Sequence, residues 1–198
     1  MLEAILQNYL KPPSIPSSLL NQSAQILTRK YHTLQTNNFN PTTKMSCNVV
    51  SNPSFEAGLN GWHARPLGVA TIVTGDVAYD GSNLVSLATT PDVPSATVDQ
   101  YLYDLDTANT YNLTVQVRIE GDLPSANQCT FSVEAGDDPA VGTIASDFVW
   151  NAGEWIELSG TYQPTVVDTV LNFVATCSFS GDVQLLNAYF DDVILSDC

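Results

Sequence analysis

Tyr111-Asn-Leu-Thr-Val-Gln-Val-Arg-Ile119 is the stretch that indicates the fold most directly. Apolar and polar residues alternate along it, which is the period-two pattern of a half-buried β-strand. The odd-numbered residues are apolar and are predicted to face a core, and the opposite face holds Asn112, Thr114, Gln116 and Arg118. The segment is therefore expected to be a strand that is covered on one side.

Further segments share this character, being rich in β-branched and aromatic residues and separated by Gly, Pro, Asn and Asp. No sustained helical period interrupts them. They span residues 69–74, 96–103, 128–133, 155–162, 169–177 and 189–195. Many short strands with turn residues between them are typical of an all-β sandwich or barrel, and that fold class is predicted here.

The two ends of this β-rich segment carry matched features. Asn52-Pro-Ser-Phe-Glu56 follows Cys47, and Phe190-Asp-Asp-Val-Ile-Leu195 precedes Cys198. We expect the first and last strands to be antiparallel neighbours, which would close one sandwich.

Four cysteines allow three pairings. Strand alternation turns Cys129 and Cys177 toward the core, which favours a Cys129–Cys177 bond and leaves Cys47 to pair with Cys198. A zinc site is poorly supported, because no two cysteines have C-x-x-C spacing and the chain has two histidines.

Charge divides the chain at about residue 45. Four of the six Lys and Arg lie before Met45 with one acid, whereas two bases and 20 acids follow it. Residues 1–45 are expected to be a poorly ordered or weakly helical extension, or a misassigned leader, and residues 46–198 to be the β-domain. The acidity disfavours nucleic acid and anionic membranes as partners. It suits binding of calcium or of uncharged polyols, and the alternative is that it only confers solubility.

Signals for cellular location disagree. Asn112-Leu-Thr and Asn21-Gln-Ser are glycosylation acceptor patterns, and cysteine pairs fit an oxidising, extracellular environment. The first residues carry Glu3 where a signal peptide carries base, and no apolar run reaches membrane-spanning length. Secretion is therefore expected from the β-domain alone.

The opening Cys47-Asn-Val-Val-Ser-Asn-Pro-Ser-Phe-Glu-Ala-Gly-Leu-Asn-Gly-Trp62 resembles that of CenC-like carbohydrate-binding modules, the family 4/9/22 type of galactose-binding-like jelly roll. Further matches follow in order at residues 81–87, Gln100, 109–114, 153–162 and 189–195. The resemblance covers about residues 47–196, and the cysteines at 129 and 177 look similar to fungal secreted variants. It implies a monomeric, non-catalytic module that binds β-glucan, xylan or a related wall glycan on a concave sheet face, beside wall proteins or a separate hydrolase.

The resemblance also implies a structural calcium ion. Glu56 and Asp191 match its ligand positions, and the Asp80–Gly81 region would supply further oxygens, which suits an ion that takes six to eight hard oxygen ligands. Alternation with Val193 and Leu195 predicts an inward Asp191, and an inward carboxylate needs a cation or hydrogen-bond donors. The alternative is that Asp191 accepts backbone N–H bonds in a turn.

Sugar binding needs aromatic faces and a few polar groups for the hydroxyls. The candidates are Trp150, Tyr101, Tyr103, Gln100, Gln116 and Arg118, and some of them are predicted to share one open concave face. Alternation places Tyr101 and Tyr103 on the face opposite Gln100. Trp62 and Trp155 match framework positions and are expected in the core. Tyr79 and His63 lie near loops that could line one end of a groove.

Two other functions stay open. A structural wall or surface protein would have no sugar site. A small hydrolase or lyase could use Glu134 with Asp147, or Glu154 with Glu157, but acid pairs carry no weight without the separation that sets the reaction geometry. A serine triad is disfavoured because the β-domain has one histidine and no nucleophile elbow, so no catalytic residue is assigned.

Overall fold

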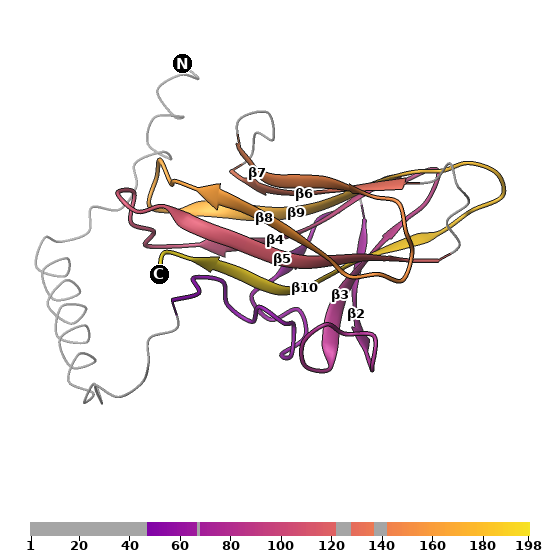
Figure 1. Ribbon diagram of the computed structural model, residues 1–198, viewed down its shortest axis with the longest axis horizontal. Helices are drawn as coiled ribbons and strands as arrows, with labels where there is room; N and C mark the ends of the chain where they lie inside the picture. Colours follow the sequence, from indigo (N-terminus) through magenta and orange to yellow (C-terminus); the bar gives the residue numbers. More distant parts are fainter. Residues whose placement is uncertain (1–46, 67, 122–127, 137–141) are drawn as a thin grey trace, which may run out of the picture. The chain divides into compact units, whose positions relative to one another are not determined.

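The computed structural model describes residues 47–66, 68–121, 128–136 and 142–198. The extension predicted for residues 1–45, with its Asn21 acceptor pattern, lies outside them. The described residues form ten β-strands in two five-stranded sheets, which face each other as two layers (Figure 1). The predicted all-β sandwich is confirmed. Within these residues, no helix is long and apolar enough to cross a membrane.

Both sheets are antiparallel, and their strand orders are those of a jelly roll. Sheet A has the order β2 (Val69–Thr74), β3 (Asn83–Thr89), β10 (Leu186–Ser196), β5 (Tyr111–Glu120) and β8 (Ile156–Tyr162). Sheet B has the order β1 (His63–Ala64), β4 (Ser95–Leu102), β9 (Thr169–Ser178), β6 (Gln128–Ala135) and β7 (Thr143–Val149).

The core lies between the sheets and is built from alternate residues of their strands. The apolar side chains predicted to point inward from β5, β6 and β9 are all buried there. Its aromatic centre joins both layers, because Phe190 of β10 contacts Phe131 and Phe173 of sheet B with ring centroids 5.2 and 5.6 Å apart. The predicted Cys129–Cys177 disulfide is present and links β6 to β9 inside this core.

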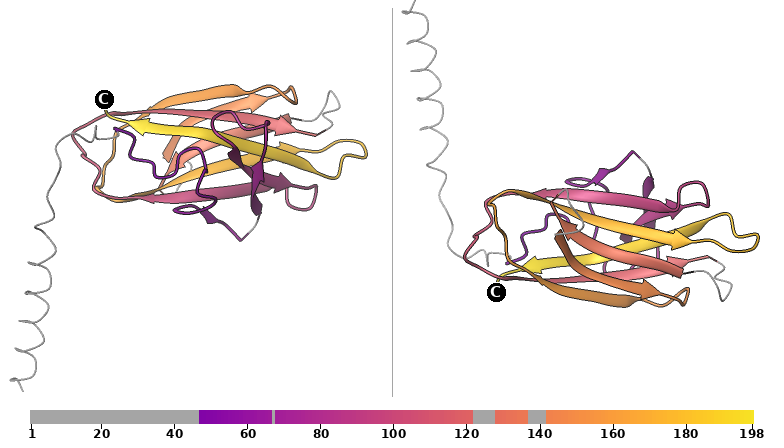
Figure 2. Two further views of the ribbon diagram at one scale, coloured as in Figure 1. Left: turned by 90° about the horizontal axis from the view of Figure 1, so that it is seen from below. Right: turned by 90° about the horizontal axis from the view of Figure 1, so that it is seen from above.

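The two ends of the domain meet as predicted. Cys47 and Cys198 form a disulfide, and beside it Asn48 makes an antiparallel bridge to Ser196. Figure 2 shows the opening segment beside β10 in both views. The segment is not a regular strand, however, because residues 51–61 form turns in which Asn52 and Phe55 adopt positive φ angles of 50° and 56°.

Strands β1, β3 and β7 were not predicted as strands. β1 has two residues, which is too short for a sequence pattern. β3 is covered on both faces, so its sequence Asn-Leu-Val-Ser-Leu-Ala-Thr lacks alternation. β7 is an edge strand whose exposed residues include Ser146 and Asp147, which weaken the apolar pattern.

Candidate functional site

The outer face of sheet B carries the polar and aromatic side chains that alternate with its core residues. Asp99 of β4 pairs with Asn172 of β9, which pairs with Glu134 of β6, so these three residues form one row across the sheet. The neighbouring row is Tyr101 and Val170. Because strand side chains alternate strictly, all five point away from the core.

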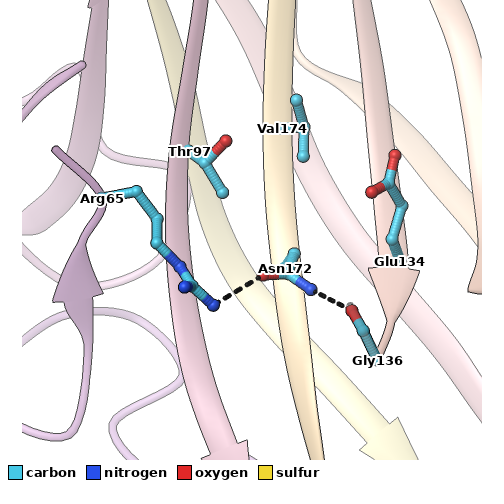
Figure 3. Close-up of a pocket in the computed structure, with 6 residues that line it drawn as sticks. All are labelled: Arg65, Thr97, Glu134, Gly136, Asn172 and Val174. Atoms are coloured by element: carbon cyan, nitrogen blue, oxygen red, sulfur yellow. Dashed lines mark hydrogen bonds between the residues drawn. The ribbon is translucent and has the colours of Figure 1, made fainter. Parts of the chain in front are cut away.

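Two hollows lie next to each other along β9 on this face, and we refer to them together as the groove. The first, of about 250 Å³, is lined by Arg65, Thr97, Glu134, Gly136, Asn172 and Val174 (Figure 3). The second, of about 360 Å³, is lined by Tyr101, Leu102, Tyr103, Gly136, Val166, Asp168, Thr169 and Val170. Gly136 borders both. From Thr97 to Tyr103 the groove spans six residues of an extended chain, or about 20 Å.

A hydrogen-bonded network crosses the groove at its first hollow. Arg65 Nη2 donates to Asp99 Oδ2 at 2.8 Å and to Asn172 Oδ1 at 3.4 Å, and Asn172 Nδ2 donates to the Gly136 carbonyl at 2.7 Å. The Asp99 side chain is 2% exposed, whereas that of Arg65 is 41% exposed. Asp99 therefore anchors a guanidinium group whose outer part faces solvent, where it can donate hydrogen bonds to a ligand.

One oxygen of the buried Asp99 carboxylate lacks a hydrogen-bond partner. Its Oδ1 is buried and has no hydrogen-bond partner among the described residues. A buried carboxylate that is satisfied on one oxygen only depends strongly on its single cation. Arg65 is therefore held in place by its attraction to Asp99 and by the free-energy cost of an unpaired buried carboxylate.

Two tyrosines form a ridge at the far end of the groove. Tyr101 and Tyr103 are 51% and 66% exposed, and their rings are nearly parallel, with an interplanar angle of 19° and centroids 6.4 Å apart. The His63 ring contacts Tyr101 edge-on at 5.7 Å. The ridge offers flat apolar surfaces beside a polar floor, which suits a ring with both apolar and hydroxyl surfaces.

A second aromatic pair lies at the diagonally opposite corner of the same face. Phe148 of β7 lies opposite Thr130, at the end of β6 remote from Glu134, and Trp150 follows the buried Val149. Phe148 and Trp150 are 50% and 62% exposed, with ring centroids 6.1 Å apart. Trp150 therefore shares the face of the tyrosines, outside the groove itself.

The three polar candidates lie elsewhere, and the expectation that Gln116 and Arg118 share a face with the tyrosines is wrong. β5 belongs to sheet A, and Gln116 and Arg118 therefore lie on the opposite side of the sandwich. There Gln116 is buried beside Glu157, and Arg118 pairs with Glu120 at 2.7 Å.

Gln100 of β4 is 2% exposed and has a different task. Its side chain bonds the backbone of Ser51, accepting from the amide at 2.8 Å and donating to the carbonyl at 2.9 Å. It thereby attaches the opening segment to sheet B. Arg65 and Asn172, which do line the groove, were not predicted as binding residues.

Asp191 is buried, but it does not face the core as alternation predicted. A β-bulge shifts the register between Asp191 and Ile194, and Asp192 has a φ of 46°. Phe190 and Val193 both reach the core across this bulge, so Asp191 points to the other side of β10.

The Asp191 carboxylate there accepts N–H bonds from Tyr79 at 2.8 Å, Asp80 at 3.1 Å and Asp192 at 2.8 Å. These are backbone N–H donors, as in the alternative to calcium that the sequence left open. Burial, only partly offset by these bonds, raises the pKa of Asp191 to about 6. Burial also raises the pKa of Asp192 and that of Tyr189 on the same strand.

Glu56 and Asp80 approach the same loop. Glu56 Oε1 accepts from the amides of Ser82 and Asn83 at 2.7 and 2.8 Å, and Asp80 Oδ2 accepts from Ser54 Oγ at 2.9 Å. Gly81, at φ 69°, lies so close to Glu56 that a side chain there would clash.

The chemistry of this donor set fits calcium, because carboxylates and loop carbonyls are its usual ligands. The carboxylate oxygens named here, however, already accept hydrogen bonds, and no group of three or more Asp, Glu, His or Cys side chains in the described part of the chain is placed to hold a metal. Calcium binding stays a prediction.

The remaining candidates are placed as follows. Trp62 lies in the core as expected, between Phe55 and Phe173 with centroids at 4.9 and 5.3 Å. Trp155 does not; it is half-buried on sheet A against Tyr79. Asn112 is exposed on β5, so its glycosylation stays a prediction.

Neither acid pair comes together at the groove. Asp147 lies opposite Phe131, which points to the core, whereas Glu134 is on the groove side. Glu157 lies opposite Gln116 on sheet A, remote from the groove, and Glu154 lies just before β8.

Solved structures of carbohydrate-binding modules share this fold. The CBM22-1–GH10 part of xylanase 10B from Clostridium thermocellum, complexed with xylohexaose, has a TM-score of 0.56 and 22% identity, over 78% of this chain and 29% of that chain. The CBM22-1 xylan-binding domain of Xyn10C from Paenibacillus barcinonensis has a TM-score of 0.52 and 20% identity, over 72% and 90%. A family 61 module complexed with β-1,4-galactotriose has a TM-score of 0.50 and 17% identity, over 77% of this chain and 100% of that chain.

These likenesses define the class of the fold, a jelly-roll β-sandwich of the kind found in carbohydrate-binding modules. Residues 47–177 match the model of the carbohydrate binding domain family CBM_4_9, and the chain belongs to this family. The predicted family resemblance is thereby confirmed. No curated protein matches the chain in sequence.

Proposed function

We propose that the groove on sheet B binds a neutral wall polysaccharide, such as a β-glucan or xylan, without cleaving it. The observation that carries the proposal is a polar hollow, lined by Arg65, Glu134 and Asn172, that lies next to an exposed tyrosine ridge on the same face of sheet B. The family membership and the glycan ligands of the structural neighbours support it.

Each part of the groove has a chemical task in this proposal. The rings of Tyr101 and Tyr103 pack against the apolar face of a pyranose, as aromatic side chains do with flat apolar groups. Arg65 donates to hydroxyl oxygens, and Glu134 accepts from hydroxyl groups. Because each new hydrogen bond replaces one to water, we expect modest affinity.

The charge of the domain supports an uncharged ligand. Two arginines and 20 acids follow Met45, so the net charge of the domain disfavours binding of an acidic polysaccharide. Catalysis is not proposed, because the members of the two acid pairs considered from sequence do not come together at the groove. The two disulfides support an extracellular location, where the domain would act as a monomer beside wall proteins or a separate hydrolase.

Binding of the full-length chain to insoluble cellulose, xylan, chitin and β-1,3-glucan tests the proposal. Tyr101→Ala should weaken binding to the preferred polymer about tenfold, because one aromatic contact is worth about 1–1.5 kcal/mol. Tyr79→Ala is the matched control, since Tyr79 is also 51% exposed but contacts Trp155, which lies just before β8 of sheet A.

Three outcomes separate the alternatives. Retention on none of the polymers would refute the proposal and favour a structural protein without a sugar site. Equal weakening by Tyr101→Ala and Tyr79→Ala would place binding outside the groove. Release of reducing sugar from a bound polymer would show catalysis.

A further inference from the structure

A third hollow lies on the far side of the tyrosine ridge. It has a volume of about 600 Å³ and is lined by Val49, Ser51, Gly61, His63, Gln100, Tyr101, Leu102 and Tyr103. We call it the side pocket. It shares Tyr101, Leu102 and Tyr103 with the second hollow of the groove, so the ridge is a common wall with an open space on each side.

The side pocket exists because the edge of β4 is only partly covered. β1 pairs with Val98 and Asp99 alone, so no strand lies beside the last residues of β4 on that edge. The chain before β1 turns away at Gly61, which has a φ of 83° and packs against Ser51 Oγ. The opening segment thus becomes the outer wall of a pocket instead of another strand.

The lining of the side pocket selects an uncharged group. None of its eight residues is Asp, Glu, Lys or Arg, and Gln100 is already engaged with the Ser51 backbone. Apolar surface comes from Val49, Leu102 and the tyrosines, while Ser51 and His63 supply hydrogen-bonding groups. This mixture of apolar walls and a few polar groups is typical of a small-ligand site, and the volume lies in the usual range.

We propose that the side pocket binds a neutral sugar branch carried by the polysaccharide whose main chain lies in the groove, a proposal that rests on the proposed function. A sugar stacked on the Tyr101–Tyr103 ridge is separated from the side pocket by the ridge alone. A branch sugar linked to that backbone sugar would therefore enter the side pocket while the backbone stays in the groove. The protein therefore prefers a substituted polysaccharide to the linear one with the same backbone.

Calorimetric titration of the full-length, oxidised chain with matched oligosaccharides tests this preference. The probes are xylohexaose, an arabinose-substituted xylo-oligosaccharide and a glucuronic-acid-substituted one, and, for a glucan backbone, cellohexaose and a xyloglucan oligosaccharide. On the backbone that is bound, the neutral branch should improve the affinity about tenfold, the worth of one further aromatic contact. The acidic branch should give no gain.

Two variants of the same chemical type separate the hollows. Val49→Trp fills the side pocket, and Val166→Trp fills the second hollow of the groove. Val49 is 36% exposed and Val166 is 54% exposed. Val49→Trp should abolish the preference for the branch and leave binding of the linear ligand unchanged, whereas Val166→Trp should weaken both ligands. Unfolding temperatures of both variants verify that the fold is retained.

Failure of this inference differs from failure of the proposed function. If the linear and branched ligands bind equally to the wild type, or if Val49→Trp weakens both equally, the side pocket does not bind a branch while the groove still binds glycan. If neither ligand binds, the proposed function falls and the inference falls with it.

Discussion

Replacing Arg65 by Met removes the cation that pairs with Asp99. The substitution keeps an aliphatic stem of similar length, so the effect reports mainly on charge and hydrogen bonding. Asp99 would then be a carboxylate that is 2% exposed, with Oδ1 already unpartnered and Oδ2 newly so.

The size of the effect follows from burial. Breaking a fully buried ion pair costs about 3–5 kcal/mol, because an uncompensated charge stays in the interior. The Arg65 side chain is 41% exposed, so water can enter where it was, and we expect a loss of about 2–3 kcal/mol in the free energy of unfolding. The double variant Arg65→Met/Asp99→Asn removes the stranded charge and should be about 1 kcal/mol more stable than Arg65→Met.

Arg118→Met is the matched control. Arg118 pairs with Glu120, whose side chain is 45% exposed and can be solvated when the arginine is lost, so the cost should stay below about 1 kcal/mol. Urea denaturation followed by tryptophan fluorescence measures all three variants, and Arg65→Met should lower the midpoint by about 1 M. A double variant no more stable than Arg65→Met would refute the reasoning, because the loss would then not arise from the buried carboxylate.

Three further predictions concern stability and metal binding. In metal-free buffer, the free energy of unfolding should fall as the pH rises from about 4 to 6, because the raised pKa of Asp191 makes the folded state bind more protons than the unfolded chain in that range. Melting temperatures measured across this pH range should show the fall, and Asp191→Asn should make it smaller. Replacing Cys129 and Cys177 by Ala should cost about 4 kcal/mol in denaturant unfolding, since their bond closes a loop of 48 residues, and an unchanged midpoint would contradict this. Calorimetric titration with calcium should give heat and a higher melting temperature that a chelator reverses and Glu56→Gln abolishes; no heat would end the calcium prediction.

The strands were predictable where the signal is local. In β5 the alternation from Tyr111 to Ile119 gives the core face directly, and the same pattern in β6 and β9 turns Cys129 and Cys177 toward each other. Each of these inferences needs one strand at a time, with its period of two.

The groove was less predictable because it depends on which strands become neighbours. β4 pairs with β9, about 75 residues later in the chain, and not with β5, so Gln116 and Arg118 lie on the wrong sheet while Asn172 joins Asp99. Local pattern does not encode that order. Polar residues inside buried strands, such as Asn172 between Leu171 and Phe173, are the signal that could have indicated the groove.

Asp191 illustrates a second limit. A single inserted residue at the β10 bulge reverses the face of every residue beyond it, so alternation counted back from Leu195 gives the wrong side. The positive φ of Asp192 marks the position, but Asp in that conformation has no sequence signature of its own.

The joining of Cys47 to Cys198 determines how the domain responds to mechanical force. A pull applied at these two residues is carried by a covalent bond, so the sheets between them bear no load and cannot unzip. After reduction, the same force would fall on the Asn48–Ser196 bridge and the Val49-to-Leu195 hydrogen bond, which would peel apart one at a time. A force applied at these two residues would therefore extend the reduced domain but not the oxidised one.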